Sequence, residues 1–210
     1  MPDEVSHFKF KMFKMIGRGV IGRRWFCAQP RACRRSSSME DMCMTPYVED
    51  GWDVRDFQKI CGSRVDVLEH VREFIVRHPK ATVHVGSDSK KRGDKIVYAV
   101  AIVLRIPERG GHVIFSKRAQ PNHKQRNEDS VFLRLNNEVK QSIEAAEALL
   151  DVVDHNKLSV HVDLSSRTQN LSHKIHSMAM GWVGALSLTA FSKPDSWAAS
   201  AVAHRFCQNW

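Results

Sequence analysis

The chain has 210 residues, of which 42% are hydrophobic and 26% are charged, and its formal net charge is +9. This length suits one domain with an appendage, or two small domains, and it is sufficient to bury a sizeable core. The five cysteines include no Cys-x-x-Cys pair, which favours free thiols over a disulfide framework. No apolar run is long enough to predict a membrane-spanning helix.

The positive charge is concentrated near the N-terminus. Nine Lys and Arg and no acid lie between residues 5 and 39, whereas residues 40–210 hold 23 basic and 21 acidic residues. This composition, with its serines and scattered large apolar residues, is typical of a mitochondrial presequence. Two alternatives stay open: a basic arm that binds RNA or a protein partner, and a tail without a role. We therefore predict a targeting or arm segment over residues 1–45, with a mitochondrial matrix location in a eukaryote and a cytoplasmic location otherwise.

Residues 46–80 are predicted to form a connector and a leading helix. The stretch 39–62 mixes acids, a proline and aromatic residues, and it is expected to be irregular. Ser63 and Asp66 are spaced as a helix-capping pair, and apolar residues follow at helical spacing until Pro79.

Residues 81–210 are predicted to form an α/β domain with the element order βββαβαβα and a mixed five-stranded sheet flanked by helices. Alternation and β-branched runs indicate the strands, and a 3.6-residue period indicates the helices. The expected strands are 82–88, 96–106, 112–117, 158–163 and 185–191, and the expected helices are 129–155, 165–180 and one that begins at Pro194.

Two aspartates follow predicted strands. Asp88 ends the first strand and Asp163 ends the fourth. Alternation places Asp88 on the face of His84, and Asp163 on the face of His161. Because ligands bind at the carboxyl ends of strands in open α/β sheets, both aspartates are candidate site residues. Each could instead simply cap a turn.

Glu138 and Asp195 are the other two candidate acids. Glu138 lies on or beside the buried stripe of the long helix, where an unpaired carboxylate would be costly. The alternative is an edge position with a lysine partner, such as Lys140 or Lys174. Asp195 is expected in the first turn of the last helix, where an acid is favourable through the helix dipole, and its register predicts that it faces inward.

Several carboxylates at one point repel each other unless a divalent cation lies between them. Oxygen-only ligands favour Mg²⁺ or Mn²⁺ over zinc. The four acids together therefore predict a divalent-metal site.

At this point the chain resembles the ribonuclease H-like superfamily, and in detail the YkuK-type family of RNase H-related nucleases. The resemblance spans about residues 82–207. It is carried by Val-Gly-Ser-Asp-Ser at 85–89, Leu-Asn-Asn-Glu-Val at 135–139, Val-His-Val-Asp-Leu-Ser at 160–165 and Lys-Pro-Asp-Ser-Trp-Ala-Ala-Ser at 193–200.

The resemblance implies strands one to three antiparallel, with strands four and five parallel to the first. It also implies that Asp88, Glu138, Asp163 and Asp195 are catalytic ligands of two Mg²⁺ or Mn²⁺ ions that promote in-line hydrolysis of a phosphodiester. Lys90, Arg134 and Lys193 are candidate substrate contacts, and Lys193 could equally be an ordinary exposed lysine. Further candidate contacts to the phosphate backbone are Lys91, Arg92, Lys124 and Arg126.

Three histidines receive separate predictions. His84 and His161 are expected to be hydrogen-bonded core residues beneath the site. His204 is expected to lie too far along the last helix from Asp195 to act as a general acid.

Three functions stay open. The first is a metal-dependent nuclease on RNA, an RNA–DNA hybrid or structured DNA, with RNA or the hybrid favoured. The second is a non-catalytic component or assembly factor of a mitochondrial ribonucleoprotein such as the mitoribosome, contacted through the N-terminal arm. The third and weakest is a DNA-junction resolvase. No membrane partner is expected.

Overall fold

A computed structural model describes residues 56–122, 128–166 and 173–208. The predicted segment at 1–45 and the candidate contacts Lys124 and Arg126 lie outside these residues. No helix in the described ranges is long and apolar enough to cross a bilayer.

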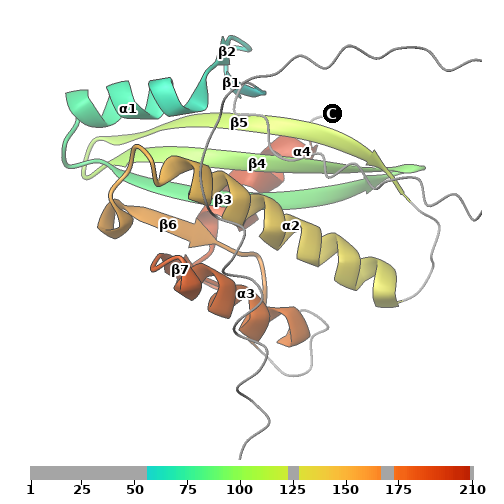
Figure 1. Ribbon diagram of the computed structural model, residues 1–210. Helices are drawn as coiled ribbons and strands as arrows, with labels where there is room; N and C mark the ends of the chain where they lie inside the picture. Colours follow the sequence, from blue (N-terminus) through green and yellow to red (C-terminus); the bar gives the residue numbers. More distant parts are fainter. Residues whose placement is uncertain (1–55, 123–127, 167–172, 209–210) are drawn as a thin grey trace, which may run out of the picture. The chain divides into compact units, whose positions relative to one another are not determined.

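The described elements form one mixed sheet with helices on both faces (Figure 1). The strands are β1 (Phe57–Lys59), β2 (Arg64–Val65), β3 (Thr82–Arg92), β4 (Lys95–Ile106), β5 (Gly110–Pro121), β6 (Leu158–His161) and β7 (Thr189–Phe191). The helices are α1 (Val67–Arg77), α2 (Glu128–Leu149), α3 (His173–Ala185) and α4 (His204–Gln208), together with a 3₁₀ turn (His155–Lys157) and a π-helical segment (Ala198–Ala203), labelled η1 and η2.

The α/β class is confirmed, and the sheet has seven strands instead of the predicted five, in the order β2-β1-β5-β4-β3-β6-β7. Strands β3, β4 and β5 form the predicted antiparallel meander. Strand β6 runs parallel to β3, and β7 runs parallel to β6, as expected.

The sheet and its core begin before residue 81. Strand β1 pairs with β5, and Val67 and Val71 of α1 join the main core cluster. The side chain of Asp66 accepts hydrogen bonds from the backbone N–H groups of Leu68 and Glu69, so Asp66 is the residue that caps this helix. The leading helix is therefore part of the α/β domain.

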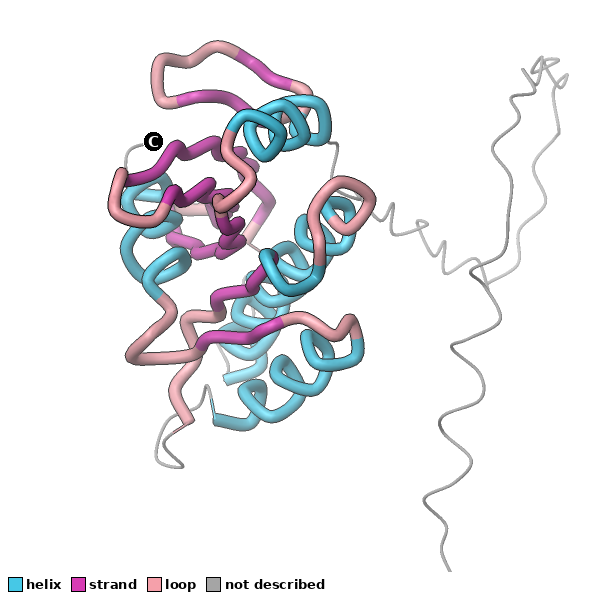
Figure 2. Tube along the Cα trace, turned by 90° about the vertical axis from the view of Figure 1, so that its left-hand side faces the viewer, coloured by secondary structure: helices cyan, strands magenta, loops and turns pink. Residues whose placement is uncertain are grey.

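The two sides of the sheet are covered differently (Figure 2). The main core cluster joins one face of the sheet to α1, α2 and α3. On the other face, Cys207 and Phe206 of α4 pack against Val97 and Ala99 of β4. Phe206 also stacks on Phe115 of β5, with ring centroids 3.8 Å apart.

Alternation along β3 directs its side chains to these two faces in turn. Val83 and Val85 face the larger core, whereas His84, Gly86 and Asp88 face α4.

The approach of η2 to β3 depends on a glycine. A Cβ atom on Gly86 would lie 2.5 Å from the backbone nitrogen of Ala199. Only glycine permits this close approach of two backbones. Gly86 therefore sets the position of η2, and of the α4 residues that follow it.

Candidate functional site

The candidate site lies where β3 and β6 separate. The last residues that pair between these strands are Gly86 and His161. Asp88 lies two residues beyond this point on β3, and Asp163 lies two residues beyond it after β6. Glu138 comes from α2, on the opposite side of the sheet. The separation of the strands lets groups from both faces approach each other.

Glu138 is held at this opening by hydrogen bonds. Its carboxylate oxygen Oε1 accepts from Ser89 Oγ at 2.5 Å and from an Arg134 guanidinium nitrogen at 3.2 Å. Glu138 is buried, and burial raises its pKa to about 7. The hydrogen bond from Ser89 and the charge of Arg134 oppose this rise. The charges of Asp88 and Asp163 add to it. Three carboxylates thus share one electrostatic environment.

The two alternatives for Glu138 are now resolved in favour of the buried stripe. Its side chain is 5% exposed, and its basic partner is Arg134, one helical turn away. Lys140, one of the lysines considered as its partner, pairs instead with Glu144. Arg134 was predicted as a substrate contact, and in the structure it also neutralises part of the Glu138 charge.

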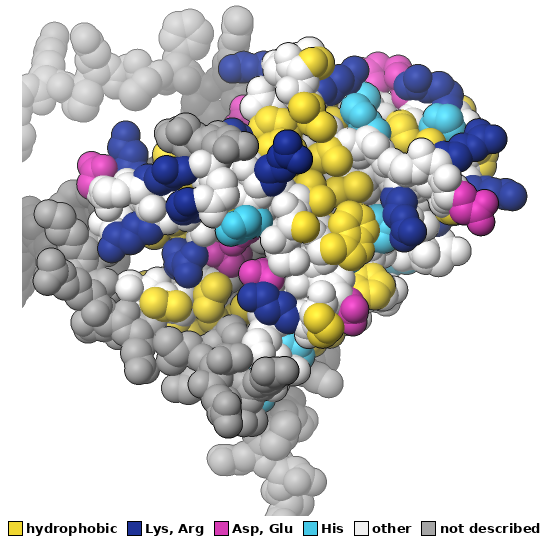
Figure 3. All heavy atoms as spheres, turned by 180° about the vertical axis from the view of Figure 1, so that it is seen from behind, with side chains coloured by type: hydrophobic (Ala, Val, Ile, Leu, Met, Phe, Trp, Pro, Cys, Tyr) yellow, Lys and Arg dark blue, Asp and Glu magenta, His cyan; other side chains and the backbone are white. Residues whose placement is uncertain are grey.

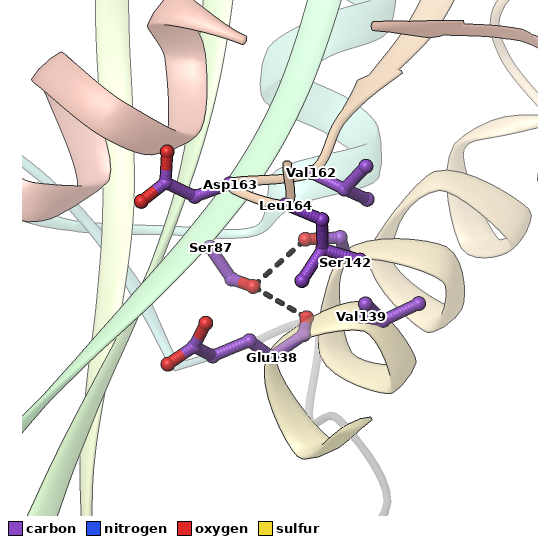
Figure 4. A pocket seen from close by; sticks show the side chains of 7 residues that line it. All are labelled: Ser87, Glu138, Val139, Ser142, Val162, Asp163 and Leu164. Atoms are coloured by element: carbon purple, nitrogen blue, oxygen red, sulfur yellow. Dashed lines mark hydrogen bonds between the residues drawn. The ribbon is translucent and has the colours of Figure 1, made fainter. Parts of the chain in front are cut away.

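Two serines fix α2 against β3 (Figure 4). Ser87 donates a hydrogen bond to the backbone carbonyl of Glu138, and Ser142 donates to Ser87 Oγ at 2.8 Å. With Glu138 and Asp163 these serines line a small pocket, whose other walls are Val139, Val162 and Leu164. Figure 4 shows the carboxylates of Glu138 and Asp163 extending toward the same side of the pocket.

The two carboxylate oxygens of Asp163 differ in their contacts with the described residues. Its Oδ2 pairs with Lys193 Nζ at 3.1 Å. Its Oδ1 is buried and has no hydrogen-bond partner within the described parts of the chain. A buried, unsatisfied carboxylate oxygen is unfavourable unless a donor or cation reaches it. Lys193, predicted to neutralise phosphate charge, lies at this site with half of its side chain exposed.

Asp88 is contacted by the last helix. Its Oδ2 lies 2.7 Å from His204 Nδ1 and accepts a hydrogen bond from the Cys207 thiol at 3.2 Å. Burial, together with the Asp88 charge, raises the pKa of Cys207 to about 12. His204, expected to lie too far along the last helix from Asp195 to act as a general acid, therefore reaches the site through Asp88 of β3 and not through Asp195.

The structure places Asp195 differently from the prediction. Asp195 is exposed and lies in the turn 192–195, before the last helix, where its N–H bonds to the Ser192 carbonyl at 2.8 Å. The predicted inward-facing position in the first helical turn is therefore wrong. Of the four predicted acids, the structure brings Asp88, Glu138 and Asp163 together, and His204 and Cys207 stand where the last helix meets Asp88.

Basic side chains lie around the acids. Figure 3 shows acidic side chains beside a histidine, bordered by Lys and Arg side chains. Lys90 contacts the Gln208 side chain, and Arg92 contacts the Gln208 backbone. These two predicted substrate contacts therefore also hold the end of α4 against β3.

The predicted pair of core histidines is confirmed. His84 Nδ1 lies 3.1 Å from His161 Nε2, and Ser159 Oγ lies 2.7 Å from His84 Nδ1. Both rings pack on Trp197. Burial lowers the pKa of each histidine to about 4. Two neutral, hydrogen-bonded imidazoles thus lie on β3 and β6, with His84 two residues before the last pair between these strands and His161 within that pair.

The residues present fit a divalent cation. Asp163 Oδ1 is a buried acceptor without a partner in the described chain, and Glu138 is a buried acid whose pKa is raised partly by Asp88 and Asp163. A cation among these groups would give Asp163 Oδ1 a partner and would relieve the repulsion between Glu138 and the two aspartates. An oxygen-only set of ligands suits Mg²⁺ or Mn²⁺.

Comparison with known proteins gives one family. A family model described as Ribonuclease H-like matches residues 66–208, which include α1 and nearly all of the described domain. The match confirms the resemblance carried by the four sequence motifs. No curated protein and no solved structure matches the chain.

Proposed function

The chain belongs to the ribonuclease H-like family, and we propose that it is a divalent-metal-dependent phosphodiester hydrolase acting on RNA, an RNA–DNA hybrid or structured DNA. The observation that carries the proposal is the convergence of Asp88, Glu138 and Asp163 from three elements. These carboxylates influence one another electrostatically, and one Asp163 oxygen is buried without a partner in the described chain.

The chain's own residues have separate roles in this proposal. Asp88, Glu138 and Asp163 would hold Mg²⁺ or Mn²⁺ ions. These ions, when bound, supply an activated water and charge neutralisation at the scissile phosphate. Ser87 and Ser89 keep Glu138 in position through their hydrogen bonds. Lys193, half exposed beside Asp163, and Arg134 are placed to attract the phosphate backbone. A role for the exposed Asp195 as a further ligand stays a prediction.

Nuclease assays on the full chain test this function. Labelled RNA, RNA–DNA hybrid and branched DNA are incubated with the wild type and with Asp88→Asn and Asp163→Asn, in Mg²⁺, Mn²⁺ or EDTA. We expect cleavage that requires the metal and falls at least about 100-fold in both variants, since each removes a charged ligand. Asp151→Asn, an exposed change in the turn that follows α2, serves as the control. Cleavage of equal rate in all four proteins would refute the assignment.

A second function is favoured by the contacts of the same acids. Asp88, Glu138 and Asp163 each already have a protein partner, namely His204, Arg134 and Lys193. A site whose three acids each have a protein partner, even with Asp163 Oδ1 left without one in the described chain, would also suit a non-catalytic component of a ribonucleoprotein, contacted through the basic segment 1–45. Co-sedimentation of the full chain with mitochondrial ribosomal particles and not with cytosolic ones, with no turnover in Mg²⁺ or Mn²⁺, would support this function and a mitochondrial location.

A further inference from the structure

The groups that meet at α4 differ in chemistry from the three carboxylates. Asp88, His204 and Cys207 each offer one ligand atom, and these three atoms lie within 4.8 Å of one another. One is a carboxylate oxygen, one an imidazole nitrogen and one a sulfur. We infer that Asp88, His204 and Cys207 form a second metal site, selective for a zinc-type transition ion, which shares Asp88 with the proposed magnesium site.

The present distances are close to those that such an ion needs. Zinc binds oxygen, nitrogen and sulfur at about 2.0–2.3 Å, so tetrahedral neighbours lie about 3.3–3.8 Å apart. Asp88 Oδ2 now lies 2.7 Å from His204 Nδ1 and 3.2 Å from Cys207 Sγ. Asp88 Oδ2 therefore needs to move away from each of these two atoms by only about 1 Å or less to reach a coordination geometry. The ligand atoms of His204 and Cys207 lie within 4.8 Å of each other, so they need to approach by about 1.5 Å at most.

The helix that carries two of the ligands is held in place. His204 and Cys207 are three residues apart on α4, so both side chains lie on the same helical face. Phe206 stacks on Phe115 of β5, and Gln208 is held by Lys90 and Arg92 of β3. This arrangement presents the two ligands to Asp88 without refolding, which lowers the entropic cost of binding.

The donor set determines which ion is selected. Sulfur and imidazole ligands favour zinc or cobalt over magnesium, whereas Glu138 and Asp163 offer oxygen alone. Cys207 would bind as the thiolate and release its proton to solvent. Cys207 itself is fully buried, but the His204 side chain is about half exposed, so solvent can reach the site from the His204 side and supply a water as the fourth ligand.

Cobalt(II) titration of the reduced, full chain tests the site directly. A thiolate ligand gives cobalt a sulfur-to-metal charge-transfer band, and a tetrahedral site gives intense d–d bands. We expect both bands in the wild type, and tighter binding of Zn²⁺ than of Co²⁺ in competition with a chromophoric chelator. Cys207→Ser should remove the charge-transfer band and weaken Zn²⁺ binding at least about 10-fold, as loss of a ligand does.

Two further variants keep the test decisive. Cys61→Ser changes an exposed cysteine outside the site and should leave the bands intact. The cysteines at 27, 33 and 43 are present in every variant, so they cannot cause a difference between the variants. His204→Gln alters a side chain that is about half exposed, so the variant should fold normally, as checked by circular dichroism, and should also weaken Zn²⁺ binding. Equal Zn²⁺ affinity in the wild type, Cys207→Ser and His204→Gln would overturn the inference.

One consequence rests on the proposed nuclease function. Because Asp88 belongs to both sites, Zn²⁺ should inhibit Mg²⁺-dependent cleavage in the wild type, and less so in Cys207→Ser. Asp163→Asn separates the two ideas: it should abolish cleavage but keep the cobalt bands. Cobalt bands in a chain that never cleaves would refute the nuclease alone, and cleavage without Cys207-dependent bands would refute the zinc-type site alone.

Discussion

Glu138 lies in an environment that is unfavourable to the charge of its carboxylate. It is 5% exposed, and burial is the largest cause of its raised pKa, ahead of the opposing Ser89 and Arg134 contacts. Near neutral pH a fraction of the molecules therefore carries a proton on this carboxyl group. A bound divalent cation would favour the ionised form, so protons and metal compete for the same side chain.

This competition predicts a pH dependence of stability. The pKa of Glu138 is about 7 in the fold against an ordinary 4.5, so the folded state binds more protons than the unfolded state between these values. Without divalent metal, the contribution of Glu138 to the free energy of unfolding is therefore fully present below pH 4.5 and is lost as pH rises through 7. The loss reaches up to about 3 kcal/mol. Urea denaturation of the wild type and Glu138→Gln across this range measures it.

The two proteins should differ in a defined way. The stability of Glu138→Gln relative to the wild type should increase as pH rises, because the neutral amide has no charge to bury. Glu147→Gln, an exposed change on the same helix, should parallel the wild type at every pH. A constant difference between the wild type and Glu138→Gln would show that the carboxyl group has the same pKa in the folded and the unfolded chain, and would contradict this prediction.

At the scale of elements, the sequence was enough to predict where Asp88, Asp163 and Glu138 lie on their strands and helix. It was not enough to predict how α4 packs against the sheet. Strict alternation in β3 and β6 places Asp88 and Asp163 on one face, and the period of α2 places Glu138 on its buried stripe. These are local regularities, which a sequence shows directly. Asp195 was misplaced because Pro194 does not begin the last helix: a turn precedes it, and the helix then opens with a π-helical segment.

His204 and Cys207 could not be connected to Asp88 by any local pattern. Their contact depends on the crossing of η2 over β3, which is a tertiary feature. The signals that were present are the three-residue spacing of His204 and Cys207, which puts two metal-binding side chains on one helical face, and the presence of Gly86 inside a strand. A glycine within a strand often marks a close backbone approach.

Gly86→Ala tests this close approach. The new Cβ would lie 2.5 Å from a backbone nitrogen of η2, so η2 and α4 must shift or the strand must distort. We expect a loss of about 1–3 kcal/mol in the free energy of unfolding, as for other overpacked cores. Gly181→Ala on α3, where a Cβ meets no atom within 4 Å, should be neutral or slightly stabilising, because alanine favours helices.

The same variant also reports on the site. If η2 positions α4, Gly86→Ala should weaken cobalt binding as well as stability, whereas Gly181→Ala should change neither adversely. Unchanged stability in Gly86→Ala would mean that the backbones of β3 and η2 can move apart without cost. Thermal denaturation and cobalt titration of the two variants decide between these outcomes.

At the scale of the whole molecule, most of the positive charge and the residues of the candidate site are separated along the chain. Nine basic residues lie between positions 5 and 39, and the remaining 171 residues from position 40 onward are close to neutral. Within the described domain, several of the basic side chains near the acids already have protein partners: Lys193, Arg134 and Arg92 contact Asp163, Glu138 and Gln208. Electrostatic affinity for nucleic acid should therefore come mainly from the N-terminal segment.

This separation predicts how RNA binding responds to salt. Each phosphate neutralised on a single strand contributes about 0.7 to the slope of log affinity against log salt concentration. Replacing the nine basic residues between positions 5 and 39 with glutamine should reduce both the affinity for RNA and this slope, and should leave the metal-dependent cleavage step unchanged at saturating RNA. Fluorescence anisotropy at several salt concentrations measures the slope. A variant in which Lys59, Lys80 and Arg109 of the described domain are replaced serves as the control, and its slope should change less. An unchanged slope in the N-terminal variant would assign that segment to targeting and not to RNA.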